Sequence, residues 1–258
     1  KTTTMSMMLG LKDPTEGKVF IFGKSPKHRD VRNSLGAMLQ EVSVIDSITV
    51  EEAIELFRSY YTNPIAIETL LQLSNLESER KQRCEKLSGG QKRRLNFALA
   101  LAGNPDLLFL DEPTVGMDIT SRRMFWETIR KLASEGKTII LTTHYLEEAD
   151  ALANRILLFA NGKIIADGTP DEMKATISRK TITFYSKESI PTKLLKELPN
   201  VTEVKSSEGR FILTTEDTDA TLKAIYQKSL PVTDVSVKRG SLDEAFEQFV
   251  ANQKEEIA

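Results

Sequence analysis

The stretch LLFLDEP, residues Leu107–Pro113, begins with the unbroken apolar run Leu107–Leu110 and continues into two consecutive carboxylates, Asp111 and Glu112. An apolar run of this length, bounded by turn signals, is typical of a strand buried on both faces of a parallel sheet. Such a strand delivers its last residues to the crevice of an α/β sheet, where ligands bind. Asp111 could there hold Mg²⁺ through a water while Glu112 orients and deprotonates an attacking water. A solvated turn or a helix cap is the alternative for this pair.

A second apolar run, Thr138–Thr143, follows a helical pattern over Ile119–Ser134 that ends at Gly136. Strand, helix and strand in this order predict two parallel strands joined by a crossover. His144 comes directly after the second run, so adjacent strands would bring His144 and Glu112 to the same edge of the sheet. An imidazole there can donate a hydrogen bond to a terminal phosphate. A purely structural histidine is the alternative.

The segment LSGGQ, Leu87–Gln91, begins a helix upstream of the first apolar run. Ser88 is a good N-cap and adds a hydroxyl donor. Gly89 and Gly90 carry no side chains, so they expose backbone N–H groups at a helix end whose dipole favours an anion. The segment therefore predicts a phosphate-binding helix end, with a flexible cap as the alternative.

The chain starts with KTT, residues Lys1–Thr3, which leads into a helix rich in Met and Leu. The end of a P-loop has this form, with Lys1 reaching the β- and γ-phosphates and the Thr2 hydroxyl as a ligand of Mg²⁺. Gln40 follows the apolar segment Leu35–Leu39 and precedes a helical region. It could touch Mg²⁺ or the attacking water, or be a surface glutamine.

In their order along the chain, these segments resemble the nucleotide-binding domain of ABC ATPases, over residues 1–178. The resemblance implies an α/β fold of the P-loop NTPase class that binds ATP and Mg²⁺. Six motifs carry it: Lys1-Thr2-Thr3 (end of the Walker A loop), Gln40 (Q-loop), Leu87–Gln91 (signature), Leu107–Glu112 (Walker B), Val115–Asp118 (D-loop) and His144 (switch histidine).

The resemblance also implies a head-to-tail homodimer that encloses two ATP molecules, with Glu112 as the general base. Residues implied to bind the nucleotide are Lys1, Thr2, Thr3, Ser88, Gly89, Gly90, Gln91, Asp111 and Asp118. Implied ligands of Mg²⁺ are Thr2, Gln40 and Asp111. Implied catalytic residues are Glu112, His144 and Gln40.

The segments Thr142–Ala149 and Gly162–Pro170 look most like the bacterial ABC-2-type exporter group. This likeness implies an ATP-hydrolysing subunit that drives export, held on the cytoplasmic face of the cell membrane by a polytopic permease. Val115 departs mildly from the family, where small polar residues are common. The glycine-rich part of the Walker A loop, the strand before it and an adenine-stacking aromatic are not found before Lys1. We therefore expect residues upstream of Lys1 in the parent protein, and no measurable ATP hydrolysis from this fragment alone.

The region at about 46–86 reads as helices without strands, so we predict a helical subdomain there. Residues 179–258 read as β-α-β-β-α-β, the order of a small ferredoxin-like α+β domain, followed by a helix over Leu242–Asn252. A short strand is predicted over Val19–Phe22, after a turn.

Composition narrows the classes of function and of partner that the chain can have. The 258 residues include 28% charged residues with a net charge of −2, a balance that argues against a nucleic-acid partner. The single cysteine fits a reducing cytosol, and no run approaches the roughly 20 apolar residues of a membrane-spanning helix. Three other functions stay open: an ABC ATPase of the translation-factor or DNA-repair type, a non-catalytic dimerising regulator, and nucleic-acid binding through Lys92-Arg93-Arg94.

Overall fold

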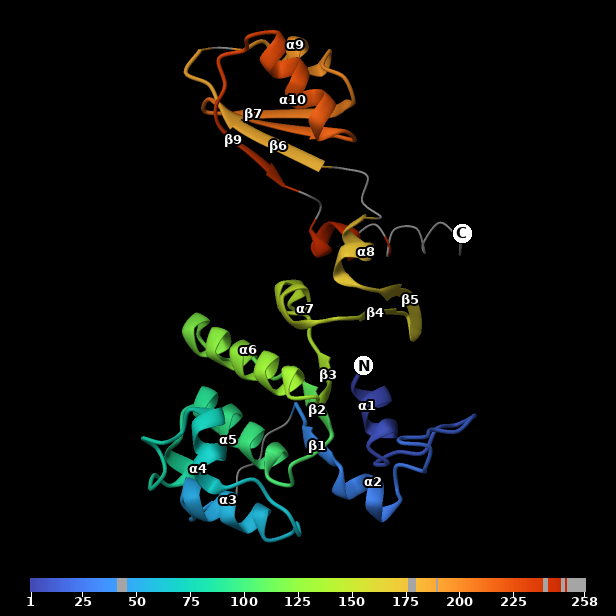
Figure 1. The fold of residues 1–258 in the computed structure, drawn as a ribbon, viewed down its shortest axis with the longest axis vertical. Coiled ribbons are helices and arrows are strands. Elements are labelled where there is room, and N and C mark those ends of the chain that lie inside the picture. The colour runs from blue at the N-terminus through green and yellow to red at the C-terminus, as the bar shows by residue number, and fades with distance from the viewer. Residues whose placement is uncertain (41–45, 176–179, 189, 239–240, 247–248, 250–258) are drawn as a thin grey trace. The chain divides into compact units, whose positions relative to one another are not determined.

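The computed structural model describes residues 1–40, 46–175, 180–188, 190–238, 241–246 and 249 (Figure 1). The chain divides into two compact units, Lys1–Tyr145 and Leu146–Ala258, called here the first and the second unit. The predicted domain boundary between residues 178 and 179 lies outside the described residues.

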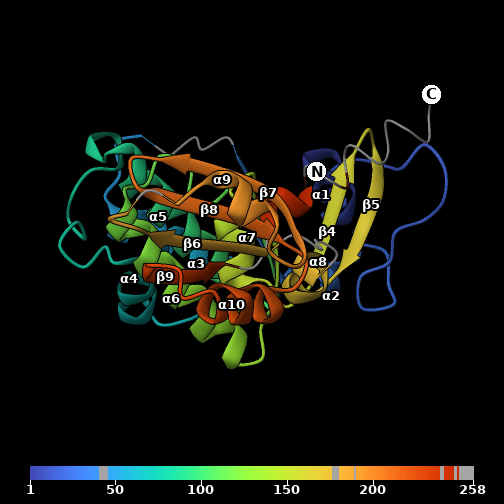
Figure 2. The ribbon, with the colours of Figure 1, turned by 90° about the horizontal axis from the view of Figure 1, so that it is seen from above.

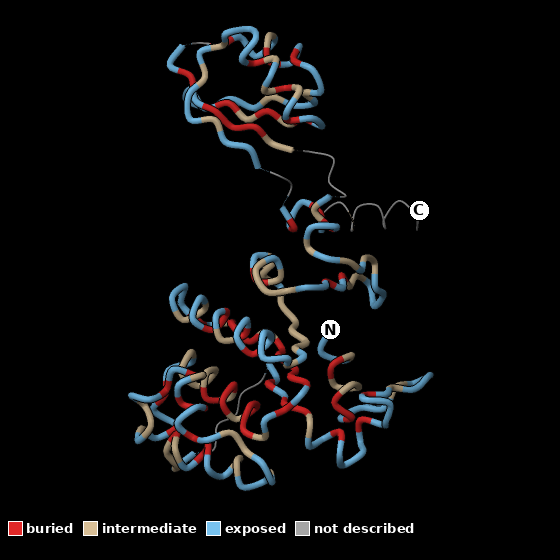
Figure 3. Tube along the Cα trace, viewed as in Figure 1, coloured by how far each residue is buried: buried red, intermediate tan, exposed pale blue. Residues whose placement is uncertain are grey.

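The first unit is built on a parallel sheet in the order β1-β2-β3. Its strands are β1 (Leu35–Met38), β2 (Leu107–Asp111) and β3 (Thr138–Thr142). The register pairs Met38 with Leu110 and Asp111 with Thr142, so all three strands end at one edge (Figure 1). The predicted parallel pair is confirmed, and β2 is its centre, with all five residues buried (Figure 3).

Helices surround this sheet because the strands are apolar on both faces. The helices of the first unit are α1 (Thr2–Met8), α2 (Arg29–Asn33), α3 (Val50–Arg58), α4 (Ile67–Ser74), α5 (Gly89–Leu101) and α6 (Ile119–Ser134), with a 3₁₀ turn, η1, over Cys84–Lys86. On one side Met5 of α1 and Val31 of α2 share a buried cluster with Phe109 of β2. Helix α5 approaches β1 so closely that a Cβ on Gly36 would lie 2.2 Å from the carbonyl oxygen of Ala100.

Within residues 46–86, the structure forms α3, α4 and η1 and no strand. An isolated bridge between Thr49 and Arg83 joins the two ends of this stretch. Thr49 also begins α3 with a capping box, in which its hydroxyl accepts from Glu52 N and the Glu52 carboxylate accepts from Thr49 N at 2.8 Å. The Cys84 side chain is fully buried here, and this burial raises the pKa of its thiol.

The predicted strand over Val19–Phe22 is wrong. Ile21 and Lys24 form only an isolated bridge, around a turn in which Phe22 and Gly23 have φ values of 51° and 73°. A positive φ leaves the extended region of backbone space, so Phe22 ends any strand at this point.

The second unit begins with a helix and a hairpin. Its elements are α7 (Leu146–Leu152), β4 (Ile156–Ala160), β5 (Lys163–Gly168), α8 (Pro170–Ala175), β6 (Lys180–Tyr185), α9 (Thr192–Lys196), β7 (Val201–Ser207), β8 (Arg210–Thr215), α10 (Thr218–Gln227) and β9 (Thr233–Lys238). Strands β4 and β5 pair antiparallel around Asn161 and Gly162. Both turn residues have a positive φ, as a tight two-residue hairpin turn requires.

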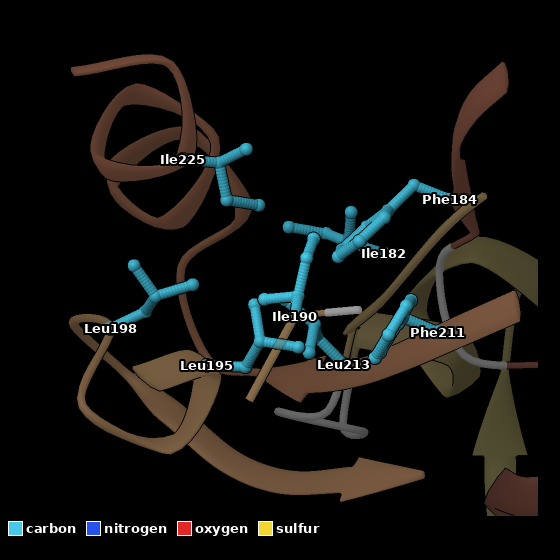
Figure 4. Close-up of a cluster of buried hydrophobic side chains, with 8 residues drawn as sticks. All are labelled: Ile182, Phe184, Ile190, Leu195, Leu198, Phe211, Leu213 and Ile225. Atoms are coloured by element: carbon cyan, nitrogen blue, oxygen red, sulfur yellow. The ribbon is translucent and has the colours of Figure 1, made fainter. Parts of the chain in front are cut away.

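Elements β6 to β9 follow the predicted β-α-β-β-α-β order and form an antiparallel sheet, β7-β8-β6-β9 (Figure 2). Apolar side chains of β6 and β8 alternate with polar ones, so one face of the sheet packs against α9 and α10. Figure 4 shows the buried cluster that results, made of Ile182, Phe184, Ile190, Leu195, Leu198, Phe211, Leu213 and Ile225.

A separate apolar cluster joins the two ends of the second unit. Leu242 is buried together with Ile156, Leu158 and Met173, and Phe249 packs against the same group. The predicted helix over Leu242–Asn252 lies partly outside the described residues.

Candidate active site

Asp111 ends β2 in an environment that suits a cation. The residue is 1% exposed, and Thr142 on the neighbouring strand donates a hydrogen bond to its Oδ1. The second oxygen, Oδ2, is also buried and has no hydrogen-bond partner among the described residues. A buried carboxylate oxygen without a partner is costly unless a positive charge balances it. Asp111 therefore fits a role as a magnesium ligand.

Glu112 turns its side chain toward His144. The backbone N–H of Glu112 continues the strand pairing by donating to the Thr142 carbonyl at 3.0 Å, while its φ of 49° is left-handed. Glu112 Oε2 then lies 3.3 Å from His144 Nδ1, with side-chain exposures of 22% and 51%. The carboxylate and imidazole thus meet at the carboxyl edge of the sheet while both remain accessible to water and ligands.

The start of α1 reaches the same edge. Lys1 Nζ donates a hydrogen bond of 2.8 Å to the carbonyl of Thr143, the residue after β3. Thr2 and Thr3 occupy the first turn of α1 and are exposed. Gln40 is exposed two residues beyond the end of β1. The sheet edge therefore brings together the ammonium group of Lys1 and the acidic pair at the end of β2.

The LSGGQ segment forms the N-terminal end of α5. Ser88 Oγ accepts from Gln91 N at 3.2 Å and Gln91 Oε1 accepts from Ser88 N at 2.8 Å, a reciprocal capping box. Gln91 Nε2 also donates to Glu79 at 3.0 Å, which holds the Gln91 side chain in place. A Cβ on Gly89 would meet no atom within 4 Å, so this helix end opens outward. A Cβ on Gly90, in contrast, would lie 3.8 Å from the carbonyl oxygen of Gly116.

Asp118 caps α6. Its carboxylate accepts from both the backbone N–H and the hydroxyl of Ser121, each at 2.8 Å. The backbone hydrogen bond from Ser121 is the main cause of a lowered pKa for Asp118, which keeps the carboxylate ionised. In this structure Asp118 holds the beginning of the helix that follows residues 115–118.

Sequence reasoning missed two features of this edge. Thr142 holds Asp111, a contact that the parallel pairing could have indicated because the two residues lie in register. The guanidinium of Arg122 stacks on the ring of Tyr145, with Cζ 4.7 Å from the ring centre. Nothing in the spacing of these two residues signals that contact.

Three further features of the described residues bear on metal binding, on the location of grooves and on membrane crossing. In the described ranges, no group of three or more His, Cys, Asp and Glu side chains is placed to hold a metal ion. A groove of about 440 Å³ between α4, α5 and α6 contains none of the predicted site residues. Among the helices of the described ranges, none has the length and apolar character to cross a bilayer.

Comparison with known proteins gives consistent matches. The family model described as "ABC transporter" matches residues 1–115. The Nod factor export ATP-binding protein I of Burkholderia pseudomallei (strain 1710b) is 36% identical over 220 residues, which cover 82% of this chain and 72% of that protein. The protein of the same name from Rhizobium sp. (strain N33) is 40% identical over 177 residues, covering 66% of this chain and 58% of that protein.

A solved structure is also similar. It is a dimeric ATP-binding cassette in a post-hydrolysis state, bound to ADP and Pi. The two chains share 27% sequence identity with a TM-score of 0.58, and the match covers 65% of this chain and 79% of that one. The likeness thus extends from sequence motifs to the arrangement of strands and helices.

Proposed function

Because the chain belongs to the ABC transporter family, we propose that its Glu112–His144 pair drives ATP hydrolysis in the ATP-binding subunit of an exporter. ABC ATP-binding subunits bind and hydrolyse ATP. The observation that carries the proposed site is the 3.3 Å approach of His144 Nδ1 to Glu112 Oε2, beside the buried Asp111. These three side chains follow two adjacent parallel strands, where α/β sheets bind their ligands.

Each side chain at this edge has a distinct chemical role in the proposal. Glu112 accepts a proton from the attacking water and orients it. The His144 imidazole, whose Nδ1 lies beside Glu112, donates from Nε2 to an oxygen of the terminal phosphate. Lys1 neutralises phosphate charge. Bound Mg²⁺ would supply further neutralisation, and Asp111, Thr2 and Gln40 would hold it.

A second copy of the chain completes the site in this proposal. The open α5 end offers Ser88 and the N–H groups at Gly89 and Gly90 to an anion, and a helix dipole favours negative charge there. In a head-to-tail homodimer this end would meet the phosphate held by Lys1 of the other copy. The dimeric state of the similar solved structure supports this arrangement.

The membrane partner belongs to the same proposal. The relatives carry names of export ATP-binding proteins, which supports an exporter here. A polytopic permease would then hold this chain at the cytoplasmic face of the cell membrane, with residues 46–86 and Gln40 as its contact. Co-purification with such a membrane protein supports the proposal, whereas sedimentation with ribosomes would favour a translation-factor ATPase.

The decisive experiment is Glu112→Gln in the full-length protein. We expect phosphate release to fall at least about a hundredfold, because the general base is lost. Binding of a fluorescent ATP analogue should persist. The dimer should then accumulate when ATP is added, which light scattering measures. The exposed Glu127 on α6 provides the control Glu127→Gln, which should hydrolyse ATP normally. A Glu112→Gln protein that hydrolyses ATP at the wild-type rate would overturn the proposed site. A wild-type protein with no hydrolysis would favour a dimerising regulator.

A further inference from the structure

A row of stacked side chains leads from the start of α6 to the acidic edge. Arg122 Cζ lies 4.7 Å from the centre of the Tyr145 ring. The rings of Tyr145 and His144 have centroids 4.1 Å apart and planes at 39°. His144 Nδ1 in turn lies 3.3 Å from Glu112 Oε2. Each member of the row therefore touches the next.

Arg122 occupies an unfavourable place for a cation. Arg122 lies in the first turn of α6, at the positive end of the helix dipole. The backbone N–H of Arg122 donates to Asp118 O at 3.0 Å. Its Nε is buried without a hydrogen-bond partner among the described residues. Stacking on Tyr145 within 6 Å of the ring centre offsets these costs through a cation–π contact.

His144 needs such support because half of its side chain is exposed. A half-exposed ring loses rotational freedom when it is held in one orientation, and that loss opposes the 3.3 Å contact with Glu112. The backbone on either side of the ring is already fixed. Tyr145 N donates to Thr143 Oγ1 at 2.9 Å, and Lys1 Nζ donates to the Thr143 carbonyl. The Tyr145 ring then packs beside the imidazole.

We propose that Tyr145 and Arg122 are positioning residues, which hold the His144 imidazole in the orientation that meets Glu112. The inference rests on the proposed roles of Glu112 and His144. Arg122 lies one helical turn after Asp118, the cap of α6, so Arg122 and the Tyr145 ring link Asp118 with His144.

Kinetics of the full-length protein give the first test. Tyr145→Leu and Arg122→Met should each lower kcat about tenfold, since misplacing a reacting group slows turnover. The affinity for a fluorescent ATP analogue should stay within about twofold, because binding is not what these residues supply. Tyr145→Phe keeps the ring and should restore kcat, and Arg123→Met, on the exposed neighbour, is the matched control. An unchanged kcat in Tyr145→Leu would overturn the inference.

A double-mutant cycle shows whether the effect passes through His144. In a His144→Ala background, Tyr145→Leu should change kcat by less than about twofold, since residues that act through one group are not additive. The same tenfold loss in both backgrounds would mean that Tyr145 acts independently, and the inference would fail.

A spectroscopic test does not depend on turnover. The chain holds two histidines, His28 and His144, so histidine-selective ¹³C labelling gives two imidazole signals, which His144→Ala assigns. Arg122→Met should shift or broaden the His144 signal and leave His28 unchanged; an unmoved His144 signal would refute the positioning role. This test stays valid even where Glu112→Gln hydrolyses ATP normally, an outcome that defeats only the proposed function.

Discussion

At the scale of single residues, Glu112 combines a reactive position with a strained backbone. Its φ of 49° is left-handed, a conformation that costs a residue with a Cβ about 1–2 kcal/mol and costs glycine almost nothing. Such strain persists at functional sites where the surroundings hold it in place. Here the hydrogen bond from Glu112 N to Thr142 O and the fixed strand β2 do so.

The strain gives a prediction about stability. Glu112→Gly should have a free energy of unfolding about 1 kcal/mol higher than Glu112→Ala, because glycine relieves the left-handed strain. Urea denaturation of the two variants measures the difference. The same pair at Glu127, inside α6, is the control, and there glycine should be the less stable by about 1 kcal/mol. Equal stabilities at position 112 would contradict the strain argument.

Asp111 gives a prediction about metal. Wild-type protein should bind ATP more tightly with Mg²⁺ than with EDTA, and Asp111→Asn should lose this difference because a neutral amide cannot balance the cation. Isothermal titration calorimetry with both buffers measures it. The control Asp106→Asn changes an exposed residue that directly precedes β2. It should keep the wild-type difference in ATP affinity between Mg²⁺ and EDTA. A full magnesium effect in Asp111→Asn would remove Asp111 from the metal site.

At the scale of elements, the contact of α5 with β1 depends on one glycine. A Cβ on Gly36 would lie 2.2 Å from Ala100 O and 2.8 Å from Pro105 Cγ, so the helix or the strand would have to move. Gly36→Ala should therefore lower the free energy of unfolding by roughly 1–3 kcal/mol, the usual cost of overpacking. Thermal denaturation checks this, with Ala37→Ser on the exposed neighbour as control. Wild-type stability in Gly36→Ala would show that the sheet yields easily.

Elements with continuous periodicity or a usual turn or capping signal could be predicted from sequence, whereas elements without such a signal could not. The helix over Ile119–Ser134 and the apolar strand from Leu107 have the expected starts because their periodicity is continuous. Helix α2, of five residues, was missed, because its cap is a ring nitrogen of His28 that accepts from Asp30 N, and histidine is not a usual capping signal. The apolar run Val19–Phe22 predicts a strand through Phe22, but the chain turns at this residue.

At the scale of the whole molecule, most of the candidate site could be predicted because parallel strands share an edge. Knowing that β2 and β3 are adjacent is enough to bring Asp111, Glu112 and His144 together. The stack of Arg122 on Tyr145 could not be predicted, since it depends on side-chain packing between residues of different elements. The sequence pattern thus predicts which residues lie at the carboxyl edge of the sheet, whereas side-chain packing decides how those side chains are oriented.

Acid should destabilise the protein through carboxylates in both units. Hydrogen bonds from Thr49 lower the pKa of Glu52, and Arg155 lowers the pKa of Asp167. Because the folded pKa lies below the unfolded one, this stability is present above about pH 5 and is lost as the pH falls toward each lowered pKa. Urea denaturation from pH 7 to pH 3 should show the loss. Glu52→Gln should reduce the slope of the free energy of unfolding against pH. An unchanged slope would exclude Glu52 as a source of the loss in acid.

The apolar cluster around Met173 has a consequence for how this protein can be divided. Leu242 and Phe249 come from beyond the four-stranded sheet, yet they pack with Ile156 beside the hairpin. In topological terms the ferredoxin-like module is an insertion, entered after α8 and left after β9, and not a detachable tail. A chain truncated at residue 178 would lack the Leu242 and Phe249 side of this apolar cluster. Excising 180–238 and rejoining the ends would keep both sides of the cluster.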